Sequence, residues 1–437
     1  MTGKHYFGPA AALSVIVANM VGTGVFTSLG FQLVDIRTGF PLIMLWVLGG
    51  IAALCGAMCY GELGAAFPRS GGEYNFLSRI YHQSVGFIGG WVSAVIGFSA
   101  PVALAAMTFG AYTTAALGDL PTWSDTALAA GLVMAVTLLH AGRRSTSGGI
   151  QIWFTLLKVA VICVFCVAAL WTVPSLQPVS FLPAPGDGQA ISSGAFAISL
   201  IYVSYAYTGW NAATYVSGEL ERPQRDLPRI LVIGTLIVMA LYVALNGVFL
   251  LVAPMEDMSG ELEVGVVAAR AAFGEFGAQL AVVALAILLI STVSAMTIAG
   301  PRVLQIIGED LPSLRALAVT NIDGVPARAI YLQSGVALLF ILTASFESVL
   351  VFSGFTLAAM SFATVFGLLV LRWREPDLDR PYRVNLFPIP PLIYLGLTGW
   401  TLIYVLIEKP MEALAGCGLM AIGGGVYFVF RRMGQAG

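Results

Sequence analysis

The chain has 437 residues, of which 58% are hydrophobic and only 10% are charged, and its formal net charge is −2. Soluble domains carry about 25% charged residues, so this composition excludes an ordinary soluble protein and indicates an integral membrane protein. The small net charge provides no basic surface for nucleic acid. We therefore expect a lipid bilayer around the protein, no nucleic-acid partner, and a single membrane domain over residues 1–437.

Stretches of about 20 mostly apolar residues, the length that crosses a bilayer, recur twelve times. They are expected near residues 9–34, 41–67, 86–117, 125–141, 149–173, 191–218, 229–254, 277–300, 329–345, 350–371, 391–408 and 412–430. Residues 1–8 are short and polar, and we expect no cleaved leader. The predicted fold class is an all-α integral membrane protein with 12 transmembrane helices.

Positive charge is concentrated in alternate connecting loops. If the twelve spans alternate in direction, 17 Lys and Arg residues fall on the side of the N-terminus, and three fall on the other side, namely Arg37, Arg270 and Lys409. Cytoplasmic loops carry the excess of basic residues. We therefore expect a multi-pass protein of the cytoplasmic (inner) membrane with both termini in the cytoplasm. The remaining basic residue is Lys158, in the middle of the fifth span.

Glycines interrupt the first and the sixth expected spans at matching places. The first interruption is Gly22-Thr23-Gly24 and the second is Thr208-Gly209-Trp210. Unwound backbone at membrane depth is tolerated only against protein or a polar cavity, and paired interruptions in the two halves of a membrane protein indicate a transport site. For either break taken alone, the alternative is a glycine that permits close helix packing.

The ends of a broken helix carry opposite partial charges. The N–H groups after Gly22 favour a carboxylate, whereas the carbonyls near Met20 and those from Tyr205 to Thr208 favour an ammonium. One site with both kinds of end fits the head group of an α-amino acid. Because the breaks stand five spans apart, an odd number, residues 191–371 would repeat residues 9–173 in inverted orientation, with 391–430 outside the repeat.

Six motifs, two of which contain the breaks, follow in order along the chain: Gly22-Thr23-Gly24-Val25-Phe26, Tyr60-Gly61-Glu62-Leu63, Pro68-Arg69-Ser70-Gly71-Gly72-Glu73-Tyr74, Ala206-Tyr207-Thr208-Gly209-Trp210-Asn211, Gly218-Glu219-Leu220 with Pro223 and Leu227-Pro228, and Arg380-Pro381-Tyr382-Arg383-Val384. On these motifs the sequence resembles the amino acid–polyamine–organocation (APC) superfamily, and within it the L-amino acid transporter (LAT) family. The resemblance implies a leucine-transporter-like fold of five plus five inverted-repeat helices, with helices 1 and 6 unwound and two extra C-terminal helices.

The resemblance also implies a set of site residues. Thr23 and Gly24 would bind the substrate carboxylate, and the Met20 and Tyr205 carbonyls would bind its amine. Thr208 stands where the closest motif has glycine, and would narrow the pocket near the substrate side chain. The expected substrate-binding residues are thus Met20, Thr23, Gly24, Tyr205, Tyr207 and Thr208, and the expected gate or pocket wall is Trp210 and Asn211. For Trp210, simple packing is the alternative.

Lys158 is expected to have a functional role because a lysine in mid-bilayer costs about 2.5–3.5 kcal/mol on insertion scales. It lies roughly 14 Å from the start of its helix at helical rise, which is too far to reach water comfortably. In sodium-coupled members of the fold a cation joins helix 1 carbonyls to helix 8 hydroxyls, and the resemblance implies that the Lys158 ammonium replaces it. Its expected partners are Gly22 and the hydroxyls among Ser291, Thr292 and Ser294.

The predicted function is sodium-independent transport of neutral α-amino acids, such as alanine, serine or threonine, by exchange. Proton-coupled symport through Lys158, a cationic amino acid or polyamine permease, and a sensor that binds without transport remain alternatives. We expect no carboxylate in the pocket, which disfavours cationic substrates. No enzyme motif, metal cluster or cofactor motif is evident, and no cofactor is expected. In animal relatives that the sequence resembles, a cysteine in the external loop after helix 3 joins a heavy chain. The corresponding loop, residues 118–125, lacks cysteine, so the resemblance implies no disulfide-linked heavy chain.

Overall fold

The computed structural model describes residues 8–117, 120–121, 123–142, 148–322 and 324–435. Over these ranges all regular elements are helices and no strand occurs. Ten of the described helices are long and apolar enough to cross a membrane. Two shorter apolar helices, Gly194–Ala206 and Ala327–Thr343, lie where the sixth and ninth spans are expected.

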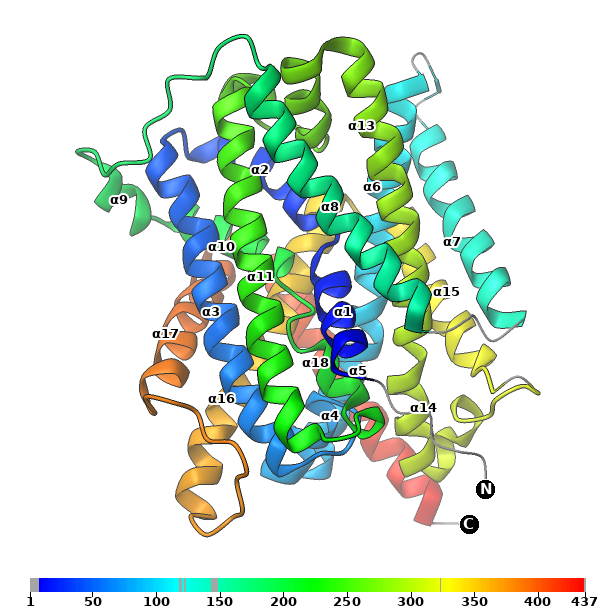
Figure 1. The fold of residues 1–437 in the computed structure, drawn as a ribbon. Helices are drawn as coiled ribbons and strands as arrows, with labels where there is room; N and C mark the ends of the chain where they lie inside the picture. The colour runs from blue at the N-terminus through cyan, green and yellow to red at the C-terminus, as the bar shows by residue number, and fades with distance from the viewer. Residues whose placement is uncertain (1–7, 118–119, 122, 143–147, 323, 436–437) are drawn as a thin grey trace.

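The elements of the bundle are shown in Figure 1. In chain order they are α1 (Pro9–Met20), α2 (Gly24–Asp35), α3 (Gly39–Ala66), α4 (Glu73–Ile80), α5 (Gln83–Val92), the π-helical η1 (Ser93–Phe98), α6 (Ser99–Leu117), α7 (Ser124–Gly142), α8 (Gly148–Thr172), α9 (Asp187–Ile191), α10 (Gly194–Ala206), the 3₁₀-helical η2 (Ala212–Glu219), α11 (Pro223–Val252), α12 (Met255–Met258), α13 (Val264–Ala299), α14 (Pro301–Asp310), the 3₁₀-helical η3 (Pro312–Leu317), α15 (Ala327–Thr343), α16 (Phe346–Arg374), α17 (Ile389–Glu408) and α18 (Pro410–Gln435).

Both expected breaks are present. In the first span, α1 ends at Met20 and α2 begins at Gly24. In the sixth span, α10 ends at Ala206 and the chain turns through Gly209, whose φ of 98° is in the left-handed region that favours glycine. The second half of this span differs from the prediction because it continues as the 3₁₀ helix η2 rather than as an α-helix.

Two other spans also depart from the prediction. The third contains the π-helical segment η1 between α5 and α6. At the eighth span, α13 begins at Val264 but consists of two helical parts that meet at Gly274, whose φ is 71°. This turn folds the chain back, so that a Cβ added to Gly265 would lie 3.2 Å from Cδ1 of Leu285 in the same element. The part of α13 after Gly274 begins close to the predicted start at residue 277, whereas apolar composition did not reveal the helical segment before it or the reversal between them.

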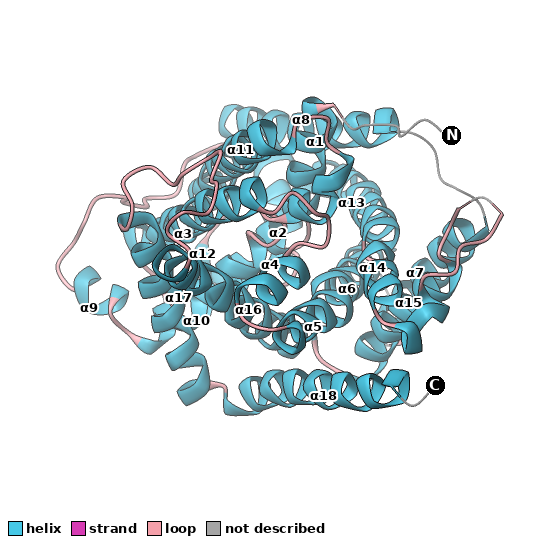
Figure 2. Ribbon diagram, turned by 90° about the horizontal axis from the view of Figure 1, so that it is seen from below, coloured by secondary structure: helices cyan, strands magenta, loops and turns pink. Residues whose placement is uncertain are grey.

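The broken helices occupy the interior of the bundle. α1 packs against α8 and α11, α2 packs against α10, and α3 packs against α10 and α11. In the view of Figure 2, α2 lies near the centre and α18 runs along the outside. The large side chains around the breaks are fully buried, Trp46, Tyr207 and Tyr242 among them. The unwound backbone therefore faces protein, as membrane depth requires.

Candidate functional site

The break between α1 and α2 lies directly against the break that follows α10. A Cβ added to Gly209 would be 2.9 Å from the backbone carbon of Asn19, and one added to Gly24 would be 2.6 Å from Cα of Ala206. Glycine at both places permits this approach, because almost no real Cβ tolerates a contact shorter than 3.0 Å. The two breaks are thus parts of one site.

Tyr242 of α11 joins the two breaks. Its hydroxyl donates to the carbonyl oxygens of Met20 and Ala206, one from each broken span. The Tyr242 ring also packs edge-on against Trp46, with 5.6 Å between ring centroids. This residue was not predicted, because the sequence around a tyrosine in an apolar helix does not show which backbone carbonyls its hydroxyl contacts.

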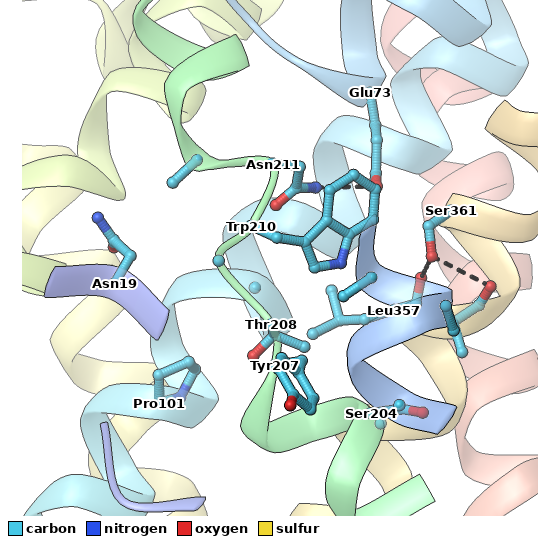
Figure 3. Close-up of a pocket in the computed structure, with 18 of the residues that line it drawn as sticks. Asn19, Glu73, Pro101, Ser204, Tyr207, Thr208, Trp210, Asn211, Leu357 and Ser361 are labelled. Carbon is cyan, nitrogen blue, oxygen red and sulfur yellow. Dashed lines mark hydrogen bonds between the residues drawn. The ribbon is translucent and has the colours of Figure 1, made fainter. Parts of the chain in front are cut away.

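A cavity of about 90 Å³ lies beside the second break. The expected site residues Tyr207, Thr208, Trp210 and Asn211 line it, together with Asn19 at the end of α1, as Figure 3 shows. The other lining residues that matter for its chemistry are Glu73, Ser204, Tyr215, Ser361 and Tyr394. The cavity wall is therefore both polar and aromatic.

Four of the expected substrate-binding residues lie outside this lining. Met20, Thr23, Gly24 and Tyr205 are buried around the α2–α10 contact. The site is thus closed where α2 meets α10, and the cavity lies on the side of α1 and η2. The structure brings the two groups of residues next to each other but does not place both in one open pocket.

The two carbonyls expected to bind an amine already have protein donors. The Tyr205 oxygen accepts from the Thr208 backbone N–H at 2.9 Å and from its hydroxyl at 2.7 Å. The Met20 oxygen accepts from the Gly22 N–H at 2.7 Å and from Tyr242. In this conformation a substrate amine would have to share or displace these donors.

Lys158 of α8 is buried, with 1% of its side chain surface exposed. Its ammonium donates to the Ala18 oxygen at 3.4 Å, the Val21 oxygen at 3.1 Å and the Thr292 hydroxyl at 2.8 Å. One side chain thus connects the first break to α13. A Cβ added to Gly22 would lie 3.8 Å from Cγ2 of Thr292, so Gly22 borders the same junction.

Of the three hydroxyls expected near Lys158, Thr292 is the one recorded within hydrogen-bond distance. The Ser294 hydroxyl instead lies 2.7 Å from Nε2 of His140 on α7. Ser291 is buried, and no contact between it and Lys158 is recorded in the described part of the chain. Residues 292 and 294 point to different neighbours because successive positions in a helix are 100° apart. The functional role of Lys158 stays a prediction.

Glu73 lines the cavity, so the expectation of a pocket without a carboxylate is wrong. The Tyr60 hydroxyl donates to Oε1 at 2.6 Å and the Asn211 amide at 3.3 Å. Glu73 belongs to the short helix α4, outside the membrane-spanning helices, and 2% of its surface is exposed. Burial raises the pKa of this carboxyl to about 7, against the opposing effect of its two hydrogen bonds.

A local signal for Glu73 was present in the sequence. Gly71 and Gly72 precede it with φ values of 116° and 51°, which only glycine adopts readily. This turn redirects the chain so that α4 begins inside the protein with Glu73 in its first turn. A glycine pair next to a single carboxylate could therefore have indicated a buried acid.

Aromatic side chains form one wall of the cavity. The Trp210 ring packs edge-on against Tyr60 at 4.6 Å and against Tyr394 at 6.3 Å between centroids. The Tyr394 hydroxyl donates to the Ser361 hydroxyl at 2.8 Å. Trp210 is thus packed on two sides as well as lining the cavity, and a gating role for it stays a prediction.

The π-helical segment η1 forms part of the opposite wall. Gly97 and Phe98 of this segment line the cavity, and the Ser93 hydroxyl lies 2.9 Å from that of Tyr215. π-helical turns inside α-helices occur frequently at functional sites. This segment could not be predicted from the sequence, because its composition is that of an ordinary apolar helix.

These observations define a class: a multi-pass helical membrane protein with a small polar pocket at two facing backbone breaks. The chain belongs to the family described as amino acid permease, whose model matches residues 7–412, and this confirms the resemblance to the APC superfamily and its LAT-type transporters. The family consists of membrane transporters rather than enzymes. Among the described residues, no group of three or more His, Cys, Asp or Glu could hold a metal ion.

The relatives are named as amino acid transporters. Large neutral amino acids transporter small subunit 2 of Oryctolagus cuniculus is 28% identical, over 98% of this chain and 80% of its own length. The b(0,+)-type amino acid transporter 1 of Mus musculus is 25% identical, over 98% of this chain and 89% of its own. Asc-type amino acid transporter 1 of Homo sapiens is 28% identical, over 98% and 82%. Amino acid transport is the activity that these relatives share.

Proposed function

We propose that the protein is a sodium-independent transporter that exchanges neutral α-amino acids across the cytoplasmic membrane by alternating access. The observation that carries this proposal is the contact of the Lys158 ammonium with Ala18, Val21 and Thr292. The Lys158 ammonium, at the junction of the first break and α13, takes the place that a bound cation would otherwise fill.

The architecture that we propose has twelve membrane spans. The first five (9–173) and the next five (191–371) form inverted repeats, and 391–430 supplies the last two helices. Support comes from the two breaks, which face each other as antiparallel repeats require, and from the basic residues of alternate loops, which favour cytoplasmic termini.

We propose that the substrate head group binds between the breaks. The first turn of α2 has N–H groups without intrahelical acceptors, and the helix dipole makes that end favourable for a carboxylate. The substrate amine would then donate to the Tyr205 and Met20 carbonyls, which now accept from Thr208 and Tyr242. Separation of Gly24 from Ala206 would open the site on the α2 side, in alternation with the α1–η2 side.

Three oxygen acceptors surround the Lys158 ammonium. A lysine that stays charged throughout the cycle replaces the sodium ion and carries no proton, so exchange is the proposed mode. Proton-coupled symport is the competing mode, and it would require Lys158 to release its proton during the cycle. An imposed pH gradient that drives uptake into empty liposomes would favour symport over exchange.

For the assembly, we propose that no heavy chain is linked to this chain by a disulfide. The support is the absence of cysteine from residues 118–125 in the sequence. One relative is named as the small subunit of a transporter, and it gives this part of the proposal no support. Electrophoresis of freshly solubilised membranes without reductant tests it: a band that shifts on reduction would contradict it.

The substrate class is tested by competition in liposomes. Uptake of labelled alanine is measured in the presence of unlabelled neutral, cationic or acidic amino acids or polyamines. The external buffer contains either sodium or choline as its cation. We expect neutral amino acids to compete and sodium to have no effect. Stimulation by sodium, or competition by polyamines alone, would overturn the proposal.

A further inference from the structure

The carboxyl group of Glu73 is only half satisfied by the protein. Oε1 accepts from Tyr60 and Asn211, whereas Oε2 is buried and has no hydrogen-bond partner among the described residues. No ion pair to Glu73 is recorded in the same part of the chain. Its other titratable neighbours are the phenols of Tyr215 and Tyr394, which carry no positive charge.

A buried oxygen without a partner is costly, at about 1–3 kcal/mol and more for a charged group. Proteins rarely leave such an atom unpaired, and unpaired ones call for a ligand, a water or a functional explanation. Here the atom belongs to a residue that lines the cavity. An unpaired acceptor therefore belongs to a side chain of the cavity wall.

The same cavity reaches from Glu73 to the second break. Asn211 follows the break residues Gly209 and Trp210, lines the cavity and contacts Glu73 Oε1 directly (Figure 3). A molecule whose head group binds at the break would therefore extend its side chain into space that Glu73 borders. A cavity of about 90 Å³ accommodates only a short side chain.

We propose that Glu73 is a specificity-determining residue whose Oε2 accepts a hydrogen bond from the substrate side chain. The pocket then favours small amino acids with a side-chain hydroxyl, such as serine and threonine, over alanine and valine. This inference rests on the proposed function, and it adds the substrate class. A site built to bond a hydroxyl discriminates strongly against the analogue that lacks it, because the site's own polar atom is left unpaired.

The test compares inhibition constants for serine against alanine, and for threonine against the isosteric valine, in sodium-free exchange. In the wild type we expect the hydroxylated member of each pair to bind about tenfold more tightly, as a hydrogen bond to a charged group allows. Glu73→Gln keeps the side-chain size and an acceptor for Tyr60, and should lose part of this preference. Glu73→Met removes both oxygens and should lose all of it.

Glu309→Gln is the matched control, because Glu309 is exposed on α14 and does not line the cavity. It should keep the wild-type preference. Equal inhibition by serine and alanine in the wild type, or an unchanged preference in Glu73→Met, would overturn the inference; a cavity water would then satisfy Oε2. If Glu73→Met does not fold, the partial loss in Glu73→Gln decides.

The inference and the proposed function fail separately. A thermal shift of the purified protein with serine or alanine measures binding without transport. If serine stabilises the wild type more than alanine but no amino acid is transported, the proposed function fails and the role of Glu73 stands. If amino acids are exchanged without a hydroxyl preference, only the role of Glu73 fails.

Discussion

At the scale of single residues, Lys158 joins two parts of the bundle that a transport cycle must move. Its ammonium satisfies two carbonyls of the first break and one hydroxyl of α13. The change Lys158→Met keeps most of the side-chain volume and removes all three donors. We expect sodium-free exchange to fall at least tenfold, because each buried acceptor left unpaired costs about 1–3 kcal/mol. Uptake of labelled alanine into preloaded liposomes measures the loss.

Lys409→Met is the control for that change. Lys409 pairs with Glu347 at 2.9 Å, and both side chains are more than a third exposed, so its removal should have little effect. Exchange at the wild-type rate in Lys158→Met would show that the ammonium is not required.

If Glu73 accepts a hydrogen bond from the substrate, we expect substrate choice to depend on pH. Burial raises its pKa to about 7, so the carboxylate predominates above pH 7 and the neutral acid below it. A carboxylate accepts a hydrogen bond more strongly than the neutral acid does. The preference for serine over alanine should therefore decrease as the pH falls from 8 to 6, while Glu73→Gln should show the same ratio throughout. A wild-type ratio that rises on acidification would contradict this role.

The sequence indicated some site residues and not others, for physical reasons. A single cation in an apolar span can be recognised without any structure, and Lys158 was found in this way. Glu73 was missed because its burial depends on how the Gly71–Gly72 turn places α4. The contacts of Tyr242 and Ser294 depend on the rotation of their helices against neighbours, and this rotation is a tertiary property.

At the scale of elements, the close contact of α2 with α10 is what closes one side of the site. The change Gly24→Ala places a Cβ 2.6 Å from Cα of Ala206, and overpacking of this kind costs about 1–3 kcal/mol. We expect a lower melting temperature and slower exchange, because the two helices can no longer close. Thermal unfolding of the purified protein and liposome uptake measure these effects.

Gly131→Ala on α7 is the matched control, since no heavy atom lies within 4 Å of its added Cβ. It should match the wild type or be slightly more stable, because alanine favours a helix more than glycine. If both variants behave alike, the α2–α10 contact is not the closing contact.

The positions of the apolar segments were predictable, but their internal irregularities were not. Ten described helices that are long and apolar enough to cross a membrane, and two shorter apolar helices, lie where hydropathy predicts spans. The glycines located both breaks. The π-helical η1, the 3₁₀ helix η2 and the reversal at Gly274 are set by packing, because the same apolar composition also forms a continuous α-helix.

At the scale of the whole molecule, polar contacts lie at both ends of the bundle. Arg69 pairs with Asp310 at 2.7 Å on the side where α3 ends. On the side where α16 begins, Tyr202 donates to Glu347 at 2.9 Å, and Glu347 pairs with Lys409. The pocket at the breaks lies between helices that reach both ends. In our proposal, the contact between Arg69 and Asp310 separates when its side of the bundle opens.

The central claim is obligatory exchange of amino acids without sodium, and counter-flow tests it most directly. The purified protein is reconstituted into liposomes that are either empty or loaded with unlabelled alanine. Labelled alanine is then added outside in sodium-free buffer. We predict rapid uptake into the loaded liposomes and almost none into the empty ones, unchanged when sodium is added outside. Equal uptake into both kinds of liposome, or uptake that requires sodium, would contradict the claim.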